Sequence, residues 1–221
     1  MDPETERVGA IYDRRGTSLT PRDGSWLFGD ARAWVASRAR GNTLEVGIGA
    51  GRTIAHYPPE VRLTGIDASG TMLAHARSAA AAAGRVVDLR LGDAMRIDAA
   101  DGTFDTVVFC LVLCTVPDDR RAILEAARVL RLGGRLVAVE HVRSPNWLVR
   151  LVEHAWEPIS IRSDGDHLLR DPADHLAASG FEVESLERGR LGIVERVVAI
   201  RTARPGSPAP LAARRCKSCR S

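Results

Sequence analysis

The amino-acid sequence predicts an α/β protein of the doubly wound kind, with helices on both faces of a mostly parallel sheet. Apolar, strand-like runs alternate with helix-like segments between residues 43 and 142, a pattern typical of parallel strands joined by crossover helices. Two further strand-like runs, 181–188 and 191–203, are separated only by "GR". So short a connection predicts a hairpin, and we place its reversed strand at the edge of the sheet.

The strands of the alternating region are short, apolar and bounded by turn residues. The fourth is apolar almost throughout, as expected for a strand buried on both faces. In chain order the predicted strands are 43–46, 61–67, 86–93, 103–113 and 135–142.

The helices are recognised by their ends. Ser69 opens a helix over 69–84 and Gly84 closes it. A helix over 118–134 begins with two aspartates, where the helix dipole favours acids, and ends in two glycines. Two further helices are predicted over 145–159 and 171–180.

The first strand runs into three glycines at alternate positions, Gly47, Gly49 and Gly51. Glycine is costly inside a strand, so this cluster indicates a tight turn or a close approach of the backbone to a ligand. The spacing is G-x-G-x-G rather than the G-x-G-x-x-G of a dinucleotide site, and no phosphate-loop lysine follows. The turn therefore predicts a nucleoside ligand without a pyrophosphate.

Acidic residues follow the second and third strands, where ligands bind in open parallel sheets. Asp67 lies 20 residues after Gly47, the separation at which an acid reaches a ribose hydroxyl pair. Asp93 ends the neighbouring strand and suits an exocyclic amine such as that of adenine. A single such aspartate is more often a cap or turn residue, but two of them behind the glycine turn favour a nucleoside site.

Length and charge narrow the class of protein. A chain of 221 residues favours one compact domain. The formal net charge is +3, and much of the excess lies in residues 201–220, so we expect no nucleic-acid partner. No apolar run reaches the roughly 18 residues of a membrane helix, and the acidic N-terminus is unlike a signal peptide. We expect a cytoplasmic monomer or homodimer without membrane insertion.

The successive motifs resemble those of class I S-adenosylmethionine-dependent methyltransferases. The stretches that carry the resemblance are "LEVGIGAGR", "LTGIDASGTML", "LGDAM", "FDTVVF" and "RVLRLGGRLVAVEHV". Within the class, the chain is similar to the branch of quinone-biosynthesis and phospholipid N-methyltransferases. The run "VVFCLVLCTVP" and the later "DGDHLLRD" are also similar to methyltransferase-like proteins that methylate alkyl thiols.

The resemblance implies a Rossmann-like sheet of seven strands and S-adenosylmethionine as cofactor. It also implies an N-terminal helical arm over residues 1–40 that acts as a lid and a cofactor-binding domain over 41–203. Residues 204–221 are rich in Pro, Ser and Arg and have no apolar period, so we expect a disordered tail there. The glycines would approach the amino acid part of the cofactor, Asp67 the ribose, Asp93 with Ala94 the adenine, and Cys110 the sulfonium. The complete set of predicted cofactor residues is Tyr12, Glu45, Gly47, Gly49, Gly51, Asp67, Ala68, Asp93, Ala94 and Cys110.

Two residues are candidates for a catalytic base. His141 ends the fifth strand, and its alternative role is a hydrogen-bonded support for Glu140. Asp166 stands where many relatives carry cysteine; its alternative is a residue of a solvated loop that ends in a helix cap at Asp171. A base is optional if the acceptor is a thiol, because thiols ionise near neutrality.

Other polar and aromatic residues are weaker candidates. Trp156 and His167 are predicted to contact substrate, although a tryptophan on a helix is more often a core residue. Cys110 and Cys114 suit small buried hydrophobic residues. Cys216 and Cys219 in the tail have the C-x-x-C spacing of half a zinc site. Since a zinc site needs two more ligands and none lies nearby in the sequence, we predict no metal.

The predicted reaction is methyl transfer to a small-molecule acceptor, and a thiol is the favoured acceptor. Oxygen, nitrogen or carbon acceptors in a natural product, a quinone precursor or a phospholipid head group are alternatives. A nicotinamide dehydrogenase is disfavoured by the glycine spacing. A nucleic-acid methyltransferase is disfavoured by "CLVLCTVP", which lacks an Asn/Asp-Pro-Pro-aromatic run. A non-catalytic nucleoside-binding protein remains open, since binding does not prove turnover.

Overall fold

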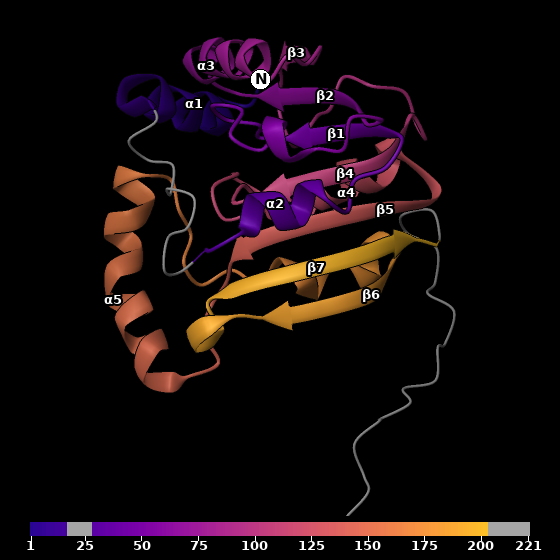
Figure 1. Cartoon of the computed structure of the whole chain (residues 1–221). Coiled ribbons are helices and arrows are strands. Elements are labelled where there is room, and N and C mark those ends of the chain that lie inside the picture. Colours follow the sequence, from indigo (N-terminus) through magenta and orange to yellow (C-terminus); the bar gives the residue numbers. More distant parts are fainter. Residues whose placement is uncertain (17–27, 203–221) are drawn as a thin grey trace, which may run out of the picture.

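A computed structural model describes residues 1–16 and 28–202 of the chain. They form a single seven-stranded sheet in the order β3-β2-β1-β4-β5-β7-β6 (Figure 1). The predicted tail, with Cys216 and Cys219, lies outside the described residues. The strands are β1 (Asn42–Val46), β2 (Arg62–Asp67), β3 (Asp88–Leu91), β4 (Phe104–Cys110), β5 (Leu130–His141), β6 (Phe181–Arg188) and β7 (Val194–Arg201).

The doubly wound class is confirmed, and one detail of the hairpin is wrong. β1, β2, β3, β4 and β5 pair in parallel, and β7 pairs antiparallel with both β5 and β6. The reversed strand β7 therefore lies inside the sheet, and β6 forms the edge. Burial explains this order, because β7 is mostly apolar and buried whereas β6 carries exposed glutamates.

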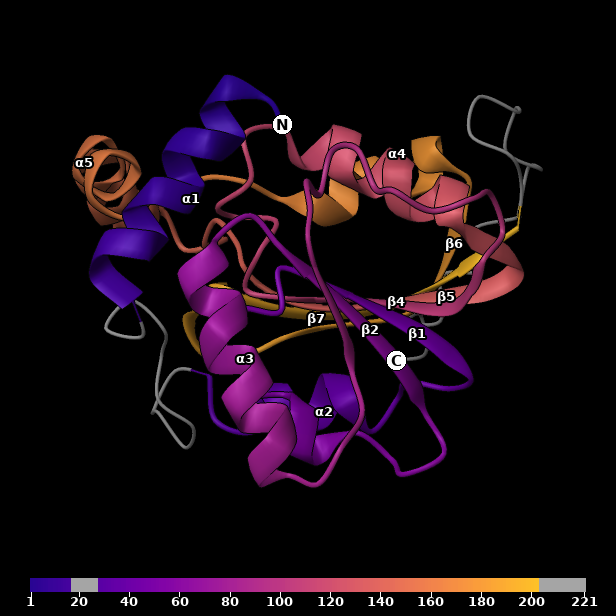
Figure 2. The same cartoon turned by 90° about the horizontal axis from the view of Figure 1, so that it is seen from above.

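Helices cover both faces of the sheet (Figure 2). The helices α2 (Ala31–Ala36) and α3 (Gly70–Ala82) cover one face, and α4 (Asp119–Val129) covers the other. The helices α1 (Pro3–Arg15) and α5 (Trp147–Ser163) stand at the end of the sheet where β1, β2, β4 and β5 finish. The short 3-10 helices are η2 (Ile54–His56), η3 (Pro172–His175), η4 (Ala177–Ser179) and η5 (Arg190–Gly192).

The helix predicted over 118–134 ends early. α4 stops at Val129, and Leu130 adopts an extended conformation (φ −72°, ψ 142°). Leu130 is fully buried and pairs with Phe104, and an irregular segment then restores the register at Arg135. The strand β5 thus begins five residues before the predicted start, because the core side chain of Leu130 outweighs the helical pattern of its neighbours.

The helix predicted over 171–180 is also absent. Two short 3-10 helices, η3 and η4, replace it. Asp171 does not cap the first of them, because its carboxylate forms ion pairs with Arg143 and Arg188. The expectation of a helix cap at Asp171 is therefore wrong.

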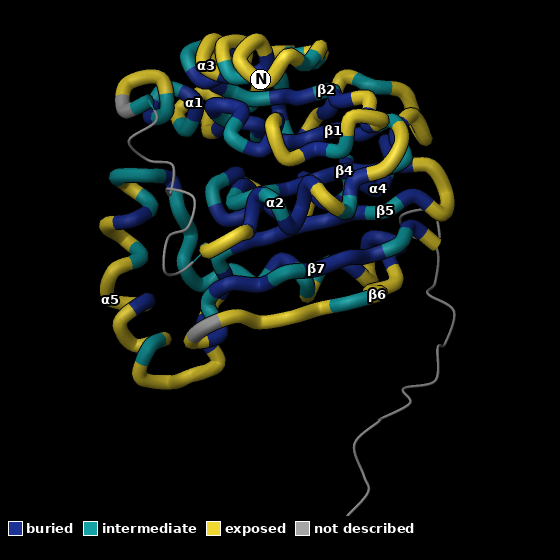
Figure 3. Tube along the Cα trace, in the orientation of Figure 1, coloured by how far each residue is buried: buried dark blue, intermediate teal, exposed yellow. Residues whose placement is uncertain are grey.

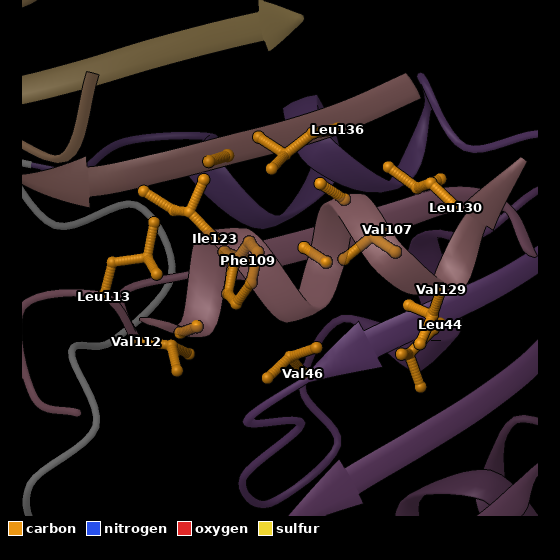
Figure 4. Packing of buried hydrophobic residues seen from close by; sticks show 14 of the residues in the cluster. Leu44, Val46, Val107, Phe109, Val112, Leu113, Ile123, Val129, Leu130 and Leu136 are labelled. Carbon is orange, nitrogen blue, oxygen red and sulfur yellow. The ribbon is translucent and has the colours of Figure 1, made fainter. Parts of the chain in front are cut away.

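Two apolar clusters, one on each face of the sheet, form the core. Figure 3 shows that the central strands β1 and β4 are mostly buried. On one face, Ile123 of α4 packs over Val107, Phe109 and Leu136 of the central strands (Figure 4). The central strands are buried on both faces, which fixes the positions of their carboxyl ends and of the loops that follow them.

Candidate active site

A cavity opens at the carboxyl ends of β1, β2 and β4. The loops after these strands form its floor, and α1 lies over it. Its lining contains nine of the ten predicted cofactor residues. These are Tyr12, Glu45, Gly47, Gly49, Asp67, Ala68, Asp93, Ala94 and Cys110.

The three glycines of the turn have different roles. All three have positive φ, which glycine adopts at low cost. Gly47 and Gly49 line the cavity. A Cβ at Gly47 would lie 2.6 Å from a Val112 methyl group, so no side chain fits there. Gly51 does not line the cavity; a Cβ there would lie 2.9 Å from the Cα of Ala76, which gives Gly51 a packing role against α3.

Asp67 holds the turn in place at the end of β2. Its carboxylate accepts hydrogen bonds from the backbone N–H groups of Gly49 (2.8 Å) and Ser69 (2.9 Å). Burial raises the pKa of Asp67, and these two donors oppose the rise. The carboxylate lines the cavity and keeps lone pairs that a ribose could use.

Asp93 ties the N-terminus of the chain to the cavity. Its carboxylate accepts hydrogen bonds from the Met95 N–H (2.9 Å), the Thr5 hydroxyl (3.4 Å) and the Asp2 N–H (3.2 Å). Ala94 follows Asp93 on the same wall. The sequence placed Asp93 beside the nucleoside but gave no sign that it also contacts α1.

α1 packs directly on the loop after β2. A Cβ at Gly9 would lie 2.7 Å from the Ala68 carbonyl oxygen, so glycine allows this close approach. The Asp13 carboxylate accepts hydrogen bonds from the Ser69 hydroxyl (2.5 Å) and the Thr71 N–H (3.1 Å) at the start of α3. Tyr12, one residue earlier, lines the cavity, and burial raises its pKa.

Glu45 and Arg32 form a buried charged region beneath the turn. Glu45 accepts hydrogen bonds from the Thr53 hydroxyl (2.7 Å) and the Tyr57 hydroxyl (3.1 Å). Burial raises the pKa of Glu45 to about 7, and the charge of Arg32 opposes the rise. Arg32 comes from α2, is buried, and lines the cavity. Sequence reasoning missed it, because α2 carries no motif and lies outside the alternating region.

His141 and Asp166, 25 positions apart in the chain, are close enough for a charge on one to act on the other, although no hydrogen bond or ion pair joins them among the described residues. Burial raises the pKa of Asp166, and a positive charge on His141 opposes the rise. His141 Nδ1 and Asp166 Oδ1 are both buried and accept or donate no hydrogen bond within the described part of the chain. Neither residue lines the cofactor cavity, so the pair lies beside it rather than in its wall.

Cys114 joins this pair to the loop after β4. Its thiol is buried, and its pKa is raised chiefly by burial and also by the nearby carboxylates of Asp166 and Glu140. Its carbonyl oxygen accepts a hydrogen bond from the His167 N–H (2.8 Å). The charge of Asp166 also raises the pKa of Tyr12. These residues lie between the predicted base and the cofactor cavity. Cys114 is 3% exposed, which confirms the prediction of a small buried residue.

Glu140 is the second residue that the sequence did not identify as important. Its carboxylate accepts hydrogen bonds from the backbone N–H groups of Val112 (3.0 Å) and Cys114 (3.4 Å). Burial raises its pKa to about 7. Glu140 itself supports the loop that lines the cavity. One signal was present in the sequence: an acid within the apolar strand "RLVAVEHV".

The two predicted substrate residues lie apart. Trp156 is 59% exposed on the outer side of α5 and does not line the cavity. His167 is half-buried beside Asp166, and burial lowers its pKa. The structure therefore keeps His167 near the His141–Asp166 pair and does not bring Trp156 there.

Comparisons with known proteins show the family of the chain. Residues 44–138 match the family described as "Methyltransferase domain". Thiol S-methyltransferase TMT1B of Homo sapiens is 32% identical over 171 residues, which cover 73% of this chain and 68% of that protein. Phosphatidylethanolamine N-methyltransferase of Cereibacter sphaeroides is 42% identical over 117 residues, covering 52% of this chain and 58% of that protein.

Solved structures share the fold. A methyltransferase structure from Bacillus halodurans matches with a TM-score of 0.67 at 19% identity, covering 78% of this chain and 98% of that one. The [4+2]-cyclase SpnF matches with a TM-score of 0.71 at 21% identity, covering 90% of this chain and 96% of that one. Since the second is described as a cyclase, this likeness shows the fold alone.

The fold and the cavity at its carboxyl edge define a nucleoside-binding α/β protein. The chain belongs to the S-adenosylmethionine-dependent methyltransferases, and its cofactor is S-adenosylmethionine. By their names, the relatives are thiol S-methyltransferases, a phosphatidylethanolamine N-methyltransferase and C-methyltransferases of ubiquinone/menaquinone biosynthesis. The acceptor of this chain therefore has to be argued from its own residues.

Proposed function

We propose that this protein transfers a methyl group from S-adenosylmethionine to a small thiol held beside His141 and Asp166. The two unpartnered buried atoms of this pair, His141 Nδ1 and Asp166 Oδ1, are the observation that carries the proposal. Buried polar atoms without partners are rare in folded proteins and call for an explanation. A bound acceptor with a transferable proton would supply the missing hydrogen bond.

Three parts of the cavity support binding of the cofactor. Asp67 would accept hydrogen bonds from the ribose hydroxyls and Asp93 from the adenine amine; both carboxylates line the cavity beyond neighbouring strands. The glycine turn offers close backbone approach to the amino acid part, and Arg32 adds a buried cation for its carboxylate. α1, which contributes Tyr12, would act as the lid.

When bound, S-adenosylmethionine supplies an electrophilic methyl group on a sulfonium. The work left to the protein is to align the acceptor, to exclude water and to remove a proton. His141 would take the proton of the thiol, and Asp166 would stabilise the resulting imidazolium. Cys114 and Tyr12, both with raised pKa, stay neutral nearby and would not compete as nucleophiles at neutral pH.

The thiol is favoured over other acceptors by the extent of the similarity to thiol S-methyltransferase TMT1B, which covers 73% of this chain. N-methylation of a phospholipid head group is the second candidate, favoured by the 42% identity to the phosphatidylethanolamine enzyme. A panel of aliphatic thiols, aromatic thiols, phenols, quinone precursors and phosphatidylethanolamine, scored by mass gain of one methyl, separates these. Methylation of phosphatidylethanolamine but of no thiol would overturn the proposal.

Replacement of Arg32 should weaken only ligands that carry the amino acid part. We expect Arg32→Met to bind S-adenosylhomocysteine about 10- to 100-fold more weakly, the scale of a lost charge-assisted hydrogen bond. Affinity for 5′-methylthioadenosine, which lacks the carboxylate, should change little. Calorimetry with both ligands checks this. Equal losses for both ligands would mean that Arg32 supports the cavity rather than the carboxylate.

Replacement of Asp67 should weaken both ligands, because both carry the ribose. We expect Asp67→Ala to reduce the affinity for each by about 10- to 100-fold. The melting temperature of the ligand-free variant measures the separate cost of losing the hydrogen bonds to Gly49 and Ser69. Unchanged affinity for 5′-methylthioadenosine would show that the ribose is bound elsewhere.

A further inference from the structure

The helix α5 is amphipathic, but its apolar face is turned to the solvent and not to the core. Apolar residues recur at three- or four-residue spacing, which places them on one face. This apolar face consists of Leu148, Leu151, Val152, Ala155 and Ile159, and all five are exposed. The two buried residues of the helix, Glu153 and Ser160, are polar, and Val149, Glu157 and Ile161 are half-buried.

The polar inner side accounts for how α5 is held. The Glu153 carboxylate accepts hydrogen bonds from the Ser144 N–H (3.0 Å) ahead of the helix. In Figure 1, α5 stands at the end of the sheet, apart from the helices that cover its faces. The apolar face therefore makes no contribution to the core. Monomeric soluble proteins rarely expose a continuous apolar surface of this kind unless it binds something.

Further exposed apolar residues and two exposed arginines lie near the apolar face. Trp147 and Trp156 are also exposed on α5. Ahead of the helix, the Ser144 hydroxyl donates a hydrogen bond to the carbonyl oxygen of Leu191 (2.6 Å). Leu191 lies in the turn between β6 and β7, where its backbone has a positive φ and its side chain is exposed. The exposed ionic side chains of α5 are Arg150 and Arg162, whereas its two acids are turned inward, buried or half-buried.

We propose that α5 docks on an anionic lipid surface and lies along it. Leucines, valine and isoleucine on one face, with an exposed tryptophan on either side and the exposed Arg162 at its C-terminal end, are a composition that partitions into the headgroup region. The exposed arginines complement anionic headgroups. No helix in the ranges 1–16 and 28–202 has the length and apolarity to cross a bilayer, so the contact is peripheral.

The position of α5 connects this contact to the site. The helix ends at Ser163, three residues before Asp166. Gly165, between them, approaches Val8 of α1; a Cβ there would lie 3.4 Å from a Val8 methyl group. Docking through α5 would therefore bring the His141–Asp166 pair and the lid region close to the lipid, where an apolar acceptor dissolves.

The test is sedimentation of the full chain with vesicles, either of phosphatidylcholine alone or of phosphatidylcholine mixed with phosphatidylglycerol. We expect binding to the mixed vesicles, a blue shift of tryptophan fluorescence, and weaker binding at high salt. The variant with both Leu148→Asp and Leu151→Asp replaces side chains that are 55% and 62% exposed. It should bind at least about tenfold more weakly with an unchanged melting temperature.

Leu132→Asp is the matched control. Leu132 is 59% exposed, but it lies near the start of β5, at the other end of that strand from α5. Its replacement should leave vesicle binding unchanged. Failure of the parent chain to sediment with mixed vesicles, or equal binding by the double variant, would overturn the proposal. A parent dimer that the double variant converts to a monomer, without vesicle binding, would instead make α5 an interface between copies.

Discussion

His141→Ala should lower turnover with an alkyl thiol by about 100-fold or more, the scale of losing a general base. The affinity for S-adenosylhomocysteine should remain nearly unchanged, because His141 does not line the cofactor cavity. The physical reason is that an alkyl thiol is mostly protonated at neutral pH. The measurement is kcat for methyl transfer at pH 7 with saturating cofactor.

The acidity of the acceptor distinguishes a base from a structural residue. An aromatic thiol that is already ionised at pH 7 needs no base. With such a thiol, the fall in kcat caused by His141→Ala should be far smaller. With the alkyl thiol, the loss should also shrink at pH 9. His75→Ala, an exposed histidine on α3, is the matched control and should behave as the parent. A loss that is equal for both thiols at both pH values would show that His141 only supports the fold.

Asp166 tests whether the pair acts as a unit. If Asp166 stabilises the imidazolium of His141, Asp166→Asn should lower turnover, and the double variant should be little worse than His141→Ala alone. Groups that act together give such non-additive losses. Additive losses would mean that the two residues contribute independently, although the structure brings them together.

The parallel part of the fold follows from local patterns in the sequence. Apolar runs and glycine turns identify each strand and its carboxyl end, and in a parallel sheet those ends converge on one edge. That convergence is why nine of the ten predicted cofactor residues line one cavity. The position of β7 inside the sheet did not follow, because a hairpin fixes which strands pair and not which of them forms the edge.

The residues missed by sequence reasoning depend on contacts between distant segments. Arg32 reaches the cavity only because α2 packs on the sheet, and no spacing in the sequence connects it to Glu45. Trp156 was predicted to contact substrate, with a place in the core as the alternative. It does neither, because it is 59% exposed and does not line the cavity. Local pattern alone cannot show which face of an isolated amphipathic helix turns inward.

The stability of the ligand-free protein should fall as the pH rises from about 4.5 to about 7. Burial raises the pKa of Glu45 and Glu140 to about 7 in the folded state, whereas an unfolded glutamate titrates near 4.3. Below both values each carboxyl is protonated in either state, and its contribution is fully present. Between them the unfolded chain ionises first, so the contribution is lost as the pH passes through the folded pKa.

Glu140→Gln isolates one of these two groups. We expect the free energy of unfolding of the variant minus that of the parent to increase by about 3 kcal/mol between pH 4.5 and pH 8, because the parent loses stability over this range. Glutamine can destabilise at every pH, because its amide group replaces an acceptor beside Val112 and Cys114. That constant offset leaves the pH dependence intact, so the slope is the quantity to compare. Urea unfolding of both chains across this range measures it.

Glu184→Gln, an exposed residue of β6, is the control and should follow the parent at every pH. Parallel curves of the free energy of unfolding against pH for Glu140→Gln and the parent would contradict a raised pKa at Glu140.

The expected loss of stability in the parent alone also concerns the loop that lines the cavity. Above pH 7 the ionised carboxylate makes stronger hydrogen bonds to the N–H groups of Val112 and Cys114, so ionisation would destabilise the fold as a whole while holding the cavity loop more firmly.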